Sequence, residues 1–110
     1  MARVGVIRAT PGFPRLDPRH WVALIERHPS LEGQRPRRGL NPFAPELITI
    51  PPRPDAARAR LHGQDVGFLR WTDRHEVDVH ALEGQAEPVI QLARELAATL
   101  GATFIPIEEL

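Results

Sequence analysis

The chain has 110 residues, a formal net charge of zero from 14 basic and 14 acidic residues, and 42% hydrophobic residues. This is the usual size of one domain and is long enough to bury a core without disulfides or metals, so we expect a single domain over residues 1–110. The apolar content argues against disorder throughout. The zero net charge argues against a nucleic-acid binder that relies on bulk electrostatics, because such proteins carry a clear basic excess.

Cysteine is absent from the chain. This excludes disulfides, thiolate metal sites, cysteine nucleophiles and thiol redox chemistry. No stretch approaches the roughly 20 apolar residues that span a bilayer, and the first residues contain no apolar run of signal-peptide length. The expected location is therefore cytoplasmic, without membrane association.

The first predicted elements are a strand and a helix. Residues 3–8 are mostly apolar and are followed by a Pro- and Gly-containing break at 10–14, which predicts a short strand. Asp17 and Pro18 predict a helix start, because Asp accepts from the unpaired N–H groups of the first turn and Pro suits its first position. Apolar residues follow at helical spacing, and Pro29 ends the helix because the residue before a proline disfavours the helical region.

Residues 29–54 are predicted to form a long crossover, in which seven prolines each fix a backbone angle and remove a donor. Only Leu47–Ile50 is strand-like, and Pro51 and Pro52 after it predict an edge strand. A connection of this length is either functional or a packed, irregular crossover, and the sequence leaves both interpretations open.

Residues 57–82 are predicted to form a three-stranded meander. Gly63-Gln64 fits a two-residue turn with Gly first, and residues 72–75 fit a second turn. The resulting register pairs Phe68 with both Ala59 and Val79, and it gives one apolar face that we expect to point to the core. The residues of this face are Ala57, Ala59, Leu61, Val66, Phe68, Val77, Val79 and Ala81.

The last predicted elements are a helix that begins near Glu87-Pro88 and ends at Gly101, and a strand at 102–107. The two amphipathic helices need an apolar surface to cover, and one sheet face provides it. The expected fold class is therefore α+β, a two-layer sandwich with a mostly antiparallel sheet and two helices on one face. The expected order is β-α-long Pro-rich crossover-β-β-β-β-α-β.

The other face of the meander is the main candidate site. By the predicted register Trp71 is exposed there beside Leu69 and Arg58, which is the composition of a protein-binding hot spot. The alternative interpretation is a solvated sheet face with cross-strand ion pairs. The residues predicted to contact a partner are Trp71, Leu69, Arg58, Arg60, Glu76, Asp78 and His80.

The basic cluster of the sequence lies in the crossover and is a candidate anion-binding site, or else a solvated loop. Its members are Arg35, Arg37, Arg38 and Arg53. Together with Arg58 and Arg60, and with Trp71 as a stacking platform, it gives a second hypothesis, nucleic-acid binding, which the neutral charge does not favour.

The last strand of the meander is a candidate metal site. Glu76, Asp78 and His80 alternate in sequence and so project from one strand face. Neighbouring positions are about 7 Å apart, too wide for one ion without a further ligand such as His62. We therefore expect no metal and no other cofactor.

Catalytic signatures are missing from the sequence. Ser30 is the only serine, Tyr and Lys do not occur, and there is no nucleotide-binding, nucleophile-elbow or zinc-protease motif. A metal- or His-dependent enzyme that pairs a residue such as His28 or His80 with a carboxylate is a third hypothesis. The favoured one is a small non-catalytic protein-binding module of the immunity, antitoxin or adaptor type. It would bind another protein, or a second copy of itself, through the exposed sheet face and the Pro-rich loop.

Overall fold

The computed structural model describes residues 1–33, 37–40, 47–50 and 55–110, with residues 37–40 and 47–50 described by their backbone alone. The elements in chain order are β1 (Ala2–Ala9), α1 (Pro18–Arg27), β2 (Leu31–Gly33), β3 (Arg37–Leu40), β4 (Leu47–Ile50), β5 (Ala56–Leu61), β6 (Gln64–Trp71), β7 (Val77–Ala81), α2 (Ala86–Leu100), β8 (Ala102–Pro106) and the short 3₁₀ helix η1 (Ile107–Glu109).

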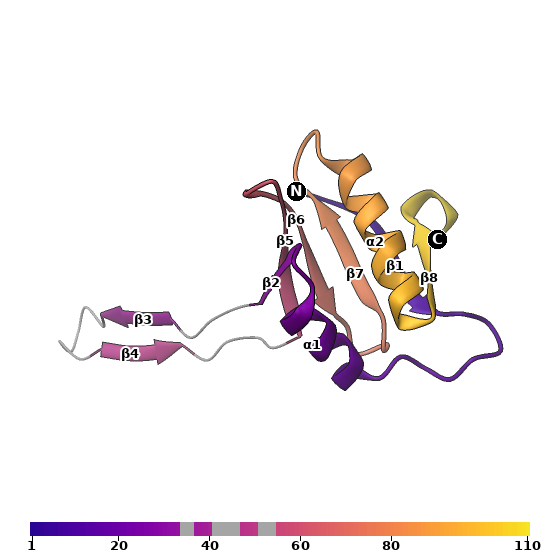
Figure 1. The fold of residues 1–110 in the computed structure, drawn as a ribbon, viewed down its shortest axis with the longest axis horizontal. Helices are drawn as coiled ribbons and strands as arrows, with labels where there is room; N and C mark the ends of the chain where they lie inside the picture. The colour runs from indigo at the N-terminus through magenta and orange to yellow at the C-terminus, as the bar shows by residue number, and fades with distance from the viewer. Residues whose placement is uncertain (34–36, 41–46, 51–54) are drawn as a thin grey trace.

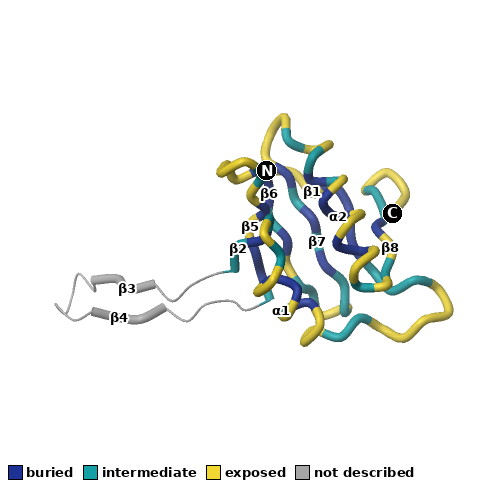
Figure 2. The backbone as a smooth tube through the Cα atoms, viewed as in Figure 1, coloured by how far each residue is buried: buried dark blue, intermediate teal, exposed yellow. Residues whose placement is uncertain are grey.

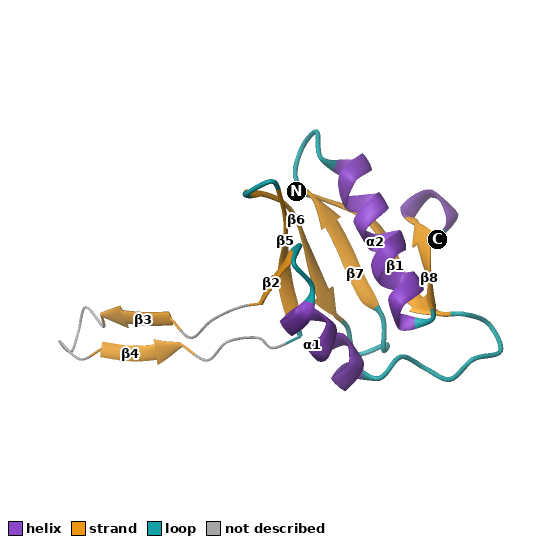
Figure 3. Ribbon diagram, in the orientation of Figure 1, coloured by secondary structure: helices purple, strands orange, loops and turns teal. Residues whose placement is uncertain are grey.

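Six of the strands form one sheet in the order β2-β5-β6-β7-β1-β8, and every neighbouring pair is antiparallel. β1 therefore lies between β7 and β8. Both long helices lie on the same face of this sheet (Figures 1 and 3). The predicted α+β fold, an antiparallel sheet with two helices on one face, is confirmed.

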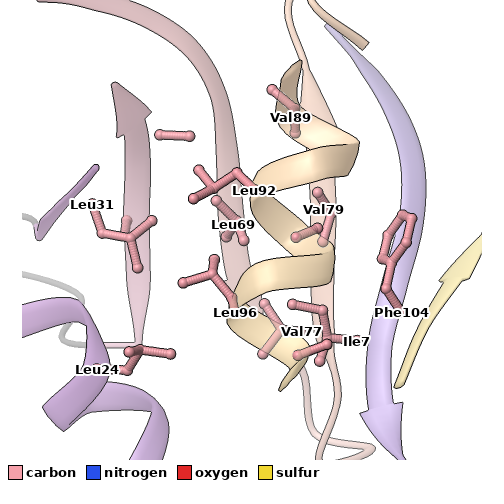
Figure 4. Close-up of a cluster of buried hydrophobic side chains, with 14 of the residues drawn as sticks. Ile7, Leu24, Leu31, Leu69, Val77, Val79, Val89, Leu92, Leu96 and Phe104 are labelled. Carbon is pink, nitrogen blue, oxygen red and sulfur yellow. The ribbon is translucent and has the colours of Figure 1, made fainter. Parts of the chain in front are cut away.

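The core fills the space between the sheet and the two helices. The buried residues form a band along the inner strands and the facing sides of the helices (Figure 2). Leu96 of α2, Leu69 of β6 and Val79 of β7 are each fully buried there (Figure 4). Burying one such side chain stabilises the fold by about 1.5–3 kcal/mol relative to leaving it in water.

The helix boundaries follow local signals in the sequence. The side chain of Asp17 accepts a 2.8 Å hydrogen bond from the backbone N–H of Arg19, so it caps α1 as predicted. Gly101 follows α2 with a φ of 67°, and its N–H donates to the carbonyls of Ala97 and Ala98. Neither of these helices, nor any other in the described part of the chain, is long and apolar enough to cross a membrane.

The predicted register of the meander is wrong by one residue. The turn between β5 and β6 is His62-Gly63, in which both residues have positive φ (52° and 78°), and not Gly63-Gln64. A two-residue turn of this kind matches the twist of the two strands. Beyond a β-bulge at Val66, Leu69 pairs with Ala57 and Val79 and points to the core, while Phe68 points to the opposite face.

A β-bulge explains why much of the predicted core face is nevertheless correct. Val66 has no opposite residue, since Ala59 pairs with Gly67 and Arg60 with Asp65. The extra residue shifts the alternation of β6, so Val66 points to the core and is 4% exposed. The members of the predicted core face that are buried are Ala57, Ala59, Val66, Val77, Val79 and Ala81.

The crossover contains more strand than the sequence predicts. The strand at Leu47–Ile50 is confirmed as β4, but it pairs with β3 in a separate two-stranded sheet and does not lie at the edge of the main sheet. The edge position beside β5 is taken by β2, only three residues long. Pro51 and Pro52 lie outside the described residues.

Candidate functional site

The open face of the six-stranded sheet, which is the face turned away from α1 and α2, is organised in rows of residues that cross the strands. The central row consists of Arg58 on β5, Phe68 on β6, His80 on β7 and Arg3 on β1. Phe68 is half-buried and has Arg58 and His80 as its cross-strand neighbours. An aromatic ring thus lies between a cation and an imidazole near the middle of this face.

The adjacent row combines small apolar and charged residues. Arg70 on β6 lies opposite Ala56 on β5 and Asp78 on β7, and Asp78 lies opposite Val6 on β1. Ala56 and Val6 are fully buried, yet neither belongs to the core cluster that packs under the helices. The row therefore has an apolar base from which the two charged side chains project.

Two ion pairs hold the arginines of β1 in place. Arg3 lies 3.0 Å from a carboxylate oxygen of Asp78, and Nε of Arg8 lies 3.0 Å from Oε2 of Glu76. Both acids are less exposed than their arginines, so the carboxylates are partly enclosed. The effect is a set of cations held at defined positions.

A second group of charges occupies the β2-β5-β6 side of the open face. Arg60 lies 2.8 Å from Glu32 and 3.0 Å from Asp65, and Arg58 lies 3.4 Å from Glu32. The hydrogen bond that Arg60 donates to the carboxylate of Glu32 raises the pKa of Arg60 above its usual value. Exposed pairs of this kind contribute little to stability, so their main effect is to order side chains.

Arg70 differs from the other arginines of the open face. It is exposed, and it forms no ion pair with any residue that the structure describes. The acid opposite it, Asp78, is engaged by Arg3. Arg70 is thus a cation with capacity for an external carboxylate.

His80 has a lowered pKa because burial disfavours its charged form. The nearby cations Arg70 and Arg3 act in the same direction, and Asp78 opposes them. The imidazole is therefore kept neutral at neutral pH, and it can both donate and accept a hydrogen bond.

Most of the predicted partner-binding residues lie together on the open face, but two do not. Leu69 is fully buried in the core, and Trp71 is on the side of the helices, partly packed against the core. Both errors follow from the register that was wrong by one residue. The residues that the structure does bring together on the open face are Arg58, Arg60, Glu76, Asp78 and His80.

Phe68 and Arg70 are the open-face residues that the sequence analysis missed. No local signal in the sequence indicates them, because moving the turn to His62-Gly63 alone leaves Phe68 on the same face as Ala57 and Ala59. The β-bulge at Val66 is what places Phe68 and Arg70 on the open face.

The basic cluster of the crossover cannot be placed, because Arg35 and Arg53 lie outside the described residues and only the backbone of Arg37 and Arg38, in β3, is described. Its binding of an anion stays a prediction.

Acidic and histidine side chains do not gather at any one point of the described chain in a way that could hold a metal ion. The two acids weighed as ligands are in ion pairs instead, Glu76 with Arg8 and Asp78 with Arg3. The open face thus offers non-covalent contacts: one aromatic ring, ordered charges and a neutral imidazole.

Comparison with known proteins adds no further guide to this site, since no protein-family model, curated protein or solved structure matches the chain.

Proposed function

We propose that this chain is a non-catalytic module that binds another protein through the open face of its six-stranded sheet. The observation that carries the proposal is the position of Phe68, a half-buried ring on the face that neither α1 nor α2 covers, between Arg58 and His80. Aromatic and arginine side chains at the centre of a surface are the residues that most often dominate binding energy.

The ion pairs of the face support the same proposal. Carboxylates of this chain already order the side chains of Arg3, Arg8, Arg58 and Arg60. A partner that contacts these arginines therefore loses less side-chain entropy on binding. A charge pattern fixed in this way selects partners by electrostatic complementarity. The chemistry expected of the partner is an apolar group over Phe68 and a carboxylate against Arg70.

The test compares three variants in capture experiments from nuclease-treated lysate, followed by affinity measurements with the purified partner. Phe68→Ser and Arg70→Glu should each weaken binding by about tenfold or more. Arg27→Glu makes the same charge change as Arg70→Glu on an exposed residue of α1 and should leave binding unchanged. A purified partner that binds all three variants as tightly as the wild type would contradict the proposal.

The same samples separate this proposal from the other hypotheses. Sedimentation of the isolated chain shows whether the partner is a second copy. Nucleic-acid binding predicts a steep loss of affinity with salt. The ion pairs of Arg58 and Arg60 leave less cationic charge for phosphates on this face, which is why protein binding is preferred here.

A further inference from the structure

A separate hollow lies at the end of the sheet where α1 begins and α2 ends. In Figure 1 the loop after β1 passes this end of the molecule before it enters α1. The hollow has a volume of about 450 Å³, within the range of small-molecule sites. Its walls come from that loop, the first turns of α1, the end of β6 and the end of α2.

The walls of the hollow are largely aromatic and aliphatic. Phe13 is 67% exposed, which is unusual for so large an apolar side chain, and Trp71 and Leu100 are only partly buried. The Trp71 ring meets His75 edge to face with 5.6 Å between centroids. An aromatic ring placed here would remove Phe13 and Trp71 from water together.

Hydrogen bonds of the loop between β1 and α1 fix the shape of the hollow. Nδ1 of His75 lies 3.2 Å from the carbonyl oxygen of Leu16, which ties the loop to the turn after β6. The backbone N–H of Phe13 donates to the carbonyl of Thr10 at 3.0 Å. A site preformed in this way loses little conformational entropy when a ligand enters.

The polar groups of the hollow favour a negatively charged ligand. Asp17, the one acid among the described residues that line the hollow, is occupied by the guanidinium and the backbone N–H of Arg19, which also lower the pKa of Asp17. Arg15 makes no hydrogen bond or ion pair with the described part of the chain, and neither does the indole N–H of Trp71. The start of α1 and the end of α2 carry opposite partial charges, so together they favour neither a negatively nor a positively charged ligand.

We infer that this hollow binds a small aromatic carboxylate, whose ring packs against Trp71 and Phe13 and whose carboxylate pairs with the guanidinium of Arg15. The site is distinct from the open face of the sheet, because Trp71 and the hollow lie on the side of the helices. This inference therefore holds or fails independently of the proposed protein binding.

The two tryptophans of the chain give a direct readout, because both line the hollow and each has one indole N–H resonance in an NMR spectrum. Trp71→Phe removes one of the two indole N–H resonances and so assigns both. Phenylacetate should shift the Trp71 signal saturably with a Kd of about 1 mM, the affinity expected of so small a ligand. The Trp21 signal should move less, because that N–H is already bonded to the carbonyl of Asp55.

Matched ligands and variants test each half of the inference. Phenylacetamide and phenethylamine should bind about tenfold more weakly than phenylacetate, and Arg15→Gln should remove this preference for the acid. Phe13→Ser should weaken all three ligands, while Arg27→Gln, an exposed arginine of α1 away from the hollow, should change none. No saturable shift up to about 10 mM phenylacetate, or a preference for the acid that survives Arg15→Gln, would overturn the inference.

Discussion

The indole N–H of Trp21 donates a 2.9 Å hydrogen bond to the backbone carbonyl oxygen of Asp55, 34 residues further along the chain. The same carbonyl accepts the backbone N–H of Trp71, also at 2.9 Å. One oxygen atom therefore connects α1 with the start of β5 and the end of β6. It fixes the place where the chain re-enters the sheet after the crossover.

Trp21→Phe should lower the free energy of unfolding by about 2–3 kcal/mol, because it removes a buried hydrogen bond and leaves a small cavity. Trp71→Phe should cost less than about 1 kcal/mol, since its ring is only partly buried and its indole has no partner among the described residues. Urea unfolding followed by circular dichroism measures both. Equal losses would contradict the assignment of Trp21 as the bonded residue.

The register of β6 can be tested by truncating two neighbours. Leu69→Ala should destabilise the protein by about 2.5–4 kcal/mol, because Leu69 is fully buried. Phe68→Ala should cost about 1 kcal/mol or less, since the ring is half-buried on the open face. The opposite ranking in urea unfolding would restore the register that the sequence predicted.

Gly67 is required by close packing. A methyl group at this position would overlap the carbonyl oxygen of His80 and lie 2.9 Å from Cγ2 of Val89 on α2. Gly67→Ala should therefore destabilise by about 3 kcal/mol. Gly84→Ala is the control, because Gly84 has positive φ but open space around it, and about 1 kcal/mol is expected. Equal losses of stability for the two variants in thermal unfolding would contradict the close packing at Gly67.

The lowered pKa of His80 gives a pH dependence with a definite sign. Because the folded state favours the neutral imidazole, the contribution of His80 to stability is complete above its unfolded pKa near 6.5 and is lost as pH falls through the lower folded pKa. The free energy of unfolding should thus fall between pH 7.5 and pH 5, and His80→Gln should reduce this fall. His62→Asn, in an exposed turn, should leave it unchanged. An equal fall in wild type and His80→Gln would show that other groups cause it.

The parts of the fold that the sequence predicts are those set by local chemistry. Asp17-Pro18 marks the start of α1 and Gly101 the end of α2, because capping depends on residues within one turn. The alternation of β7 is also local, and it correctly places Asp78 and His80 on the open face.

The parts that it misses depend on non-local pairing. In β5 the alternation of Ala and Arg fits either turn, so only the pairing with β6 decides between His62-Gly63 and Gly63-Gln64. No residue pattern in the sequence indicates the bulge at Val66. The strand β2 is too short to be predicted without its partner β5. Trp71 therefore lies on the face opposite to the predicted one, and no local pattern in the sequence indicates the hollow that it lines.

The position of β1 has a consequence for synthesis on the ribosome. Ile7 pairs with Val77 on one side and with Phe104 on the other, so β1 emerges from the exit tunnel long before either neighbour has been translated. Pairings between residues so distant in sequence slow folding and leave unpaired strand edges exposed meanwhile. A nascent chain that stalls before β8 would therefore present an incomplete sheet, so we expect chaperones to matter most between the synthesis of β1 and that of β8.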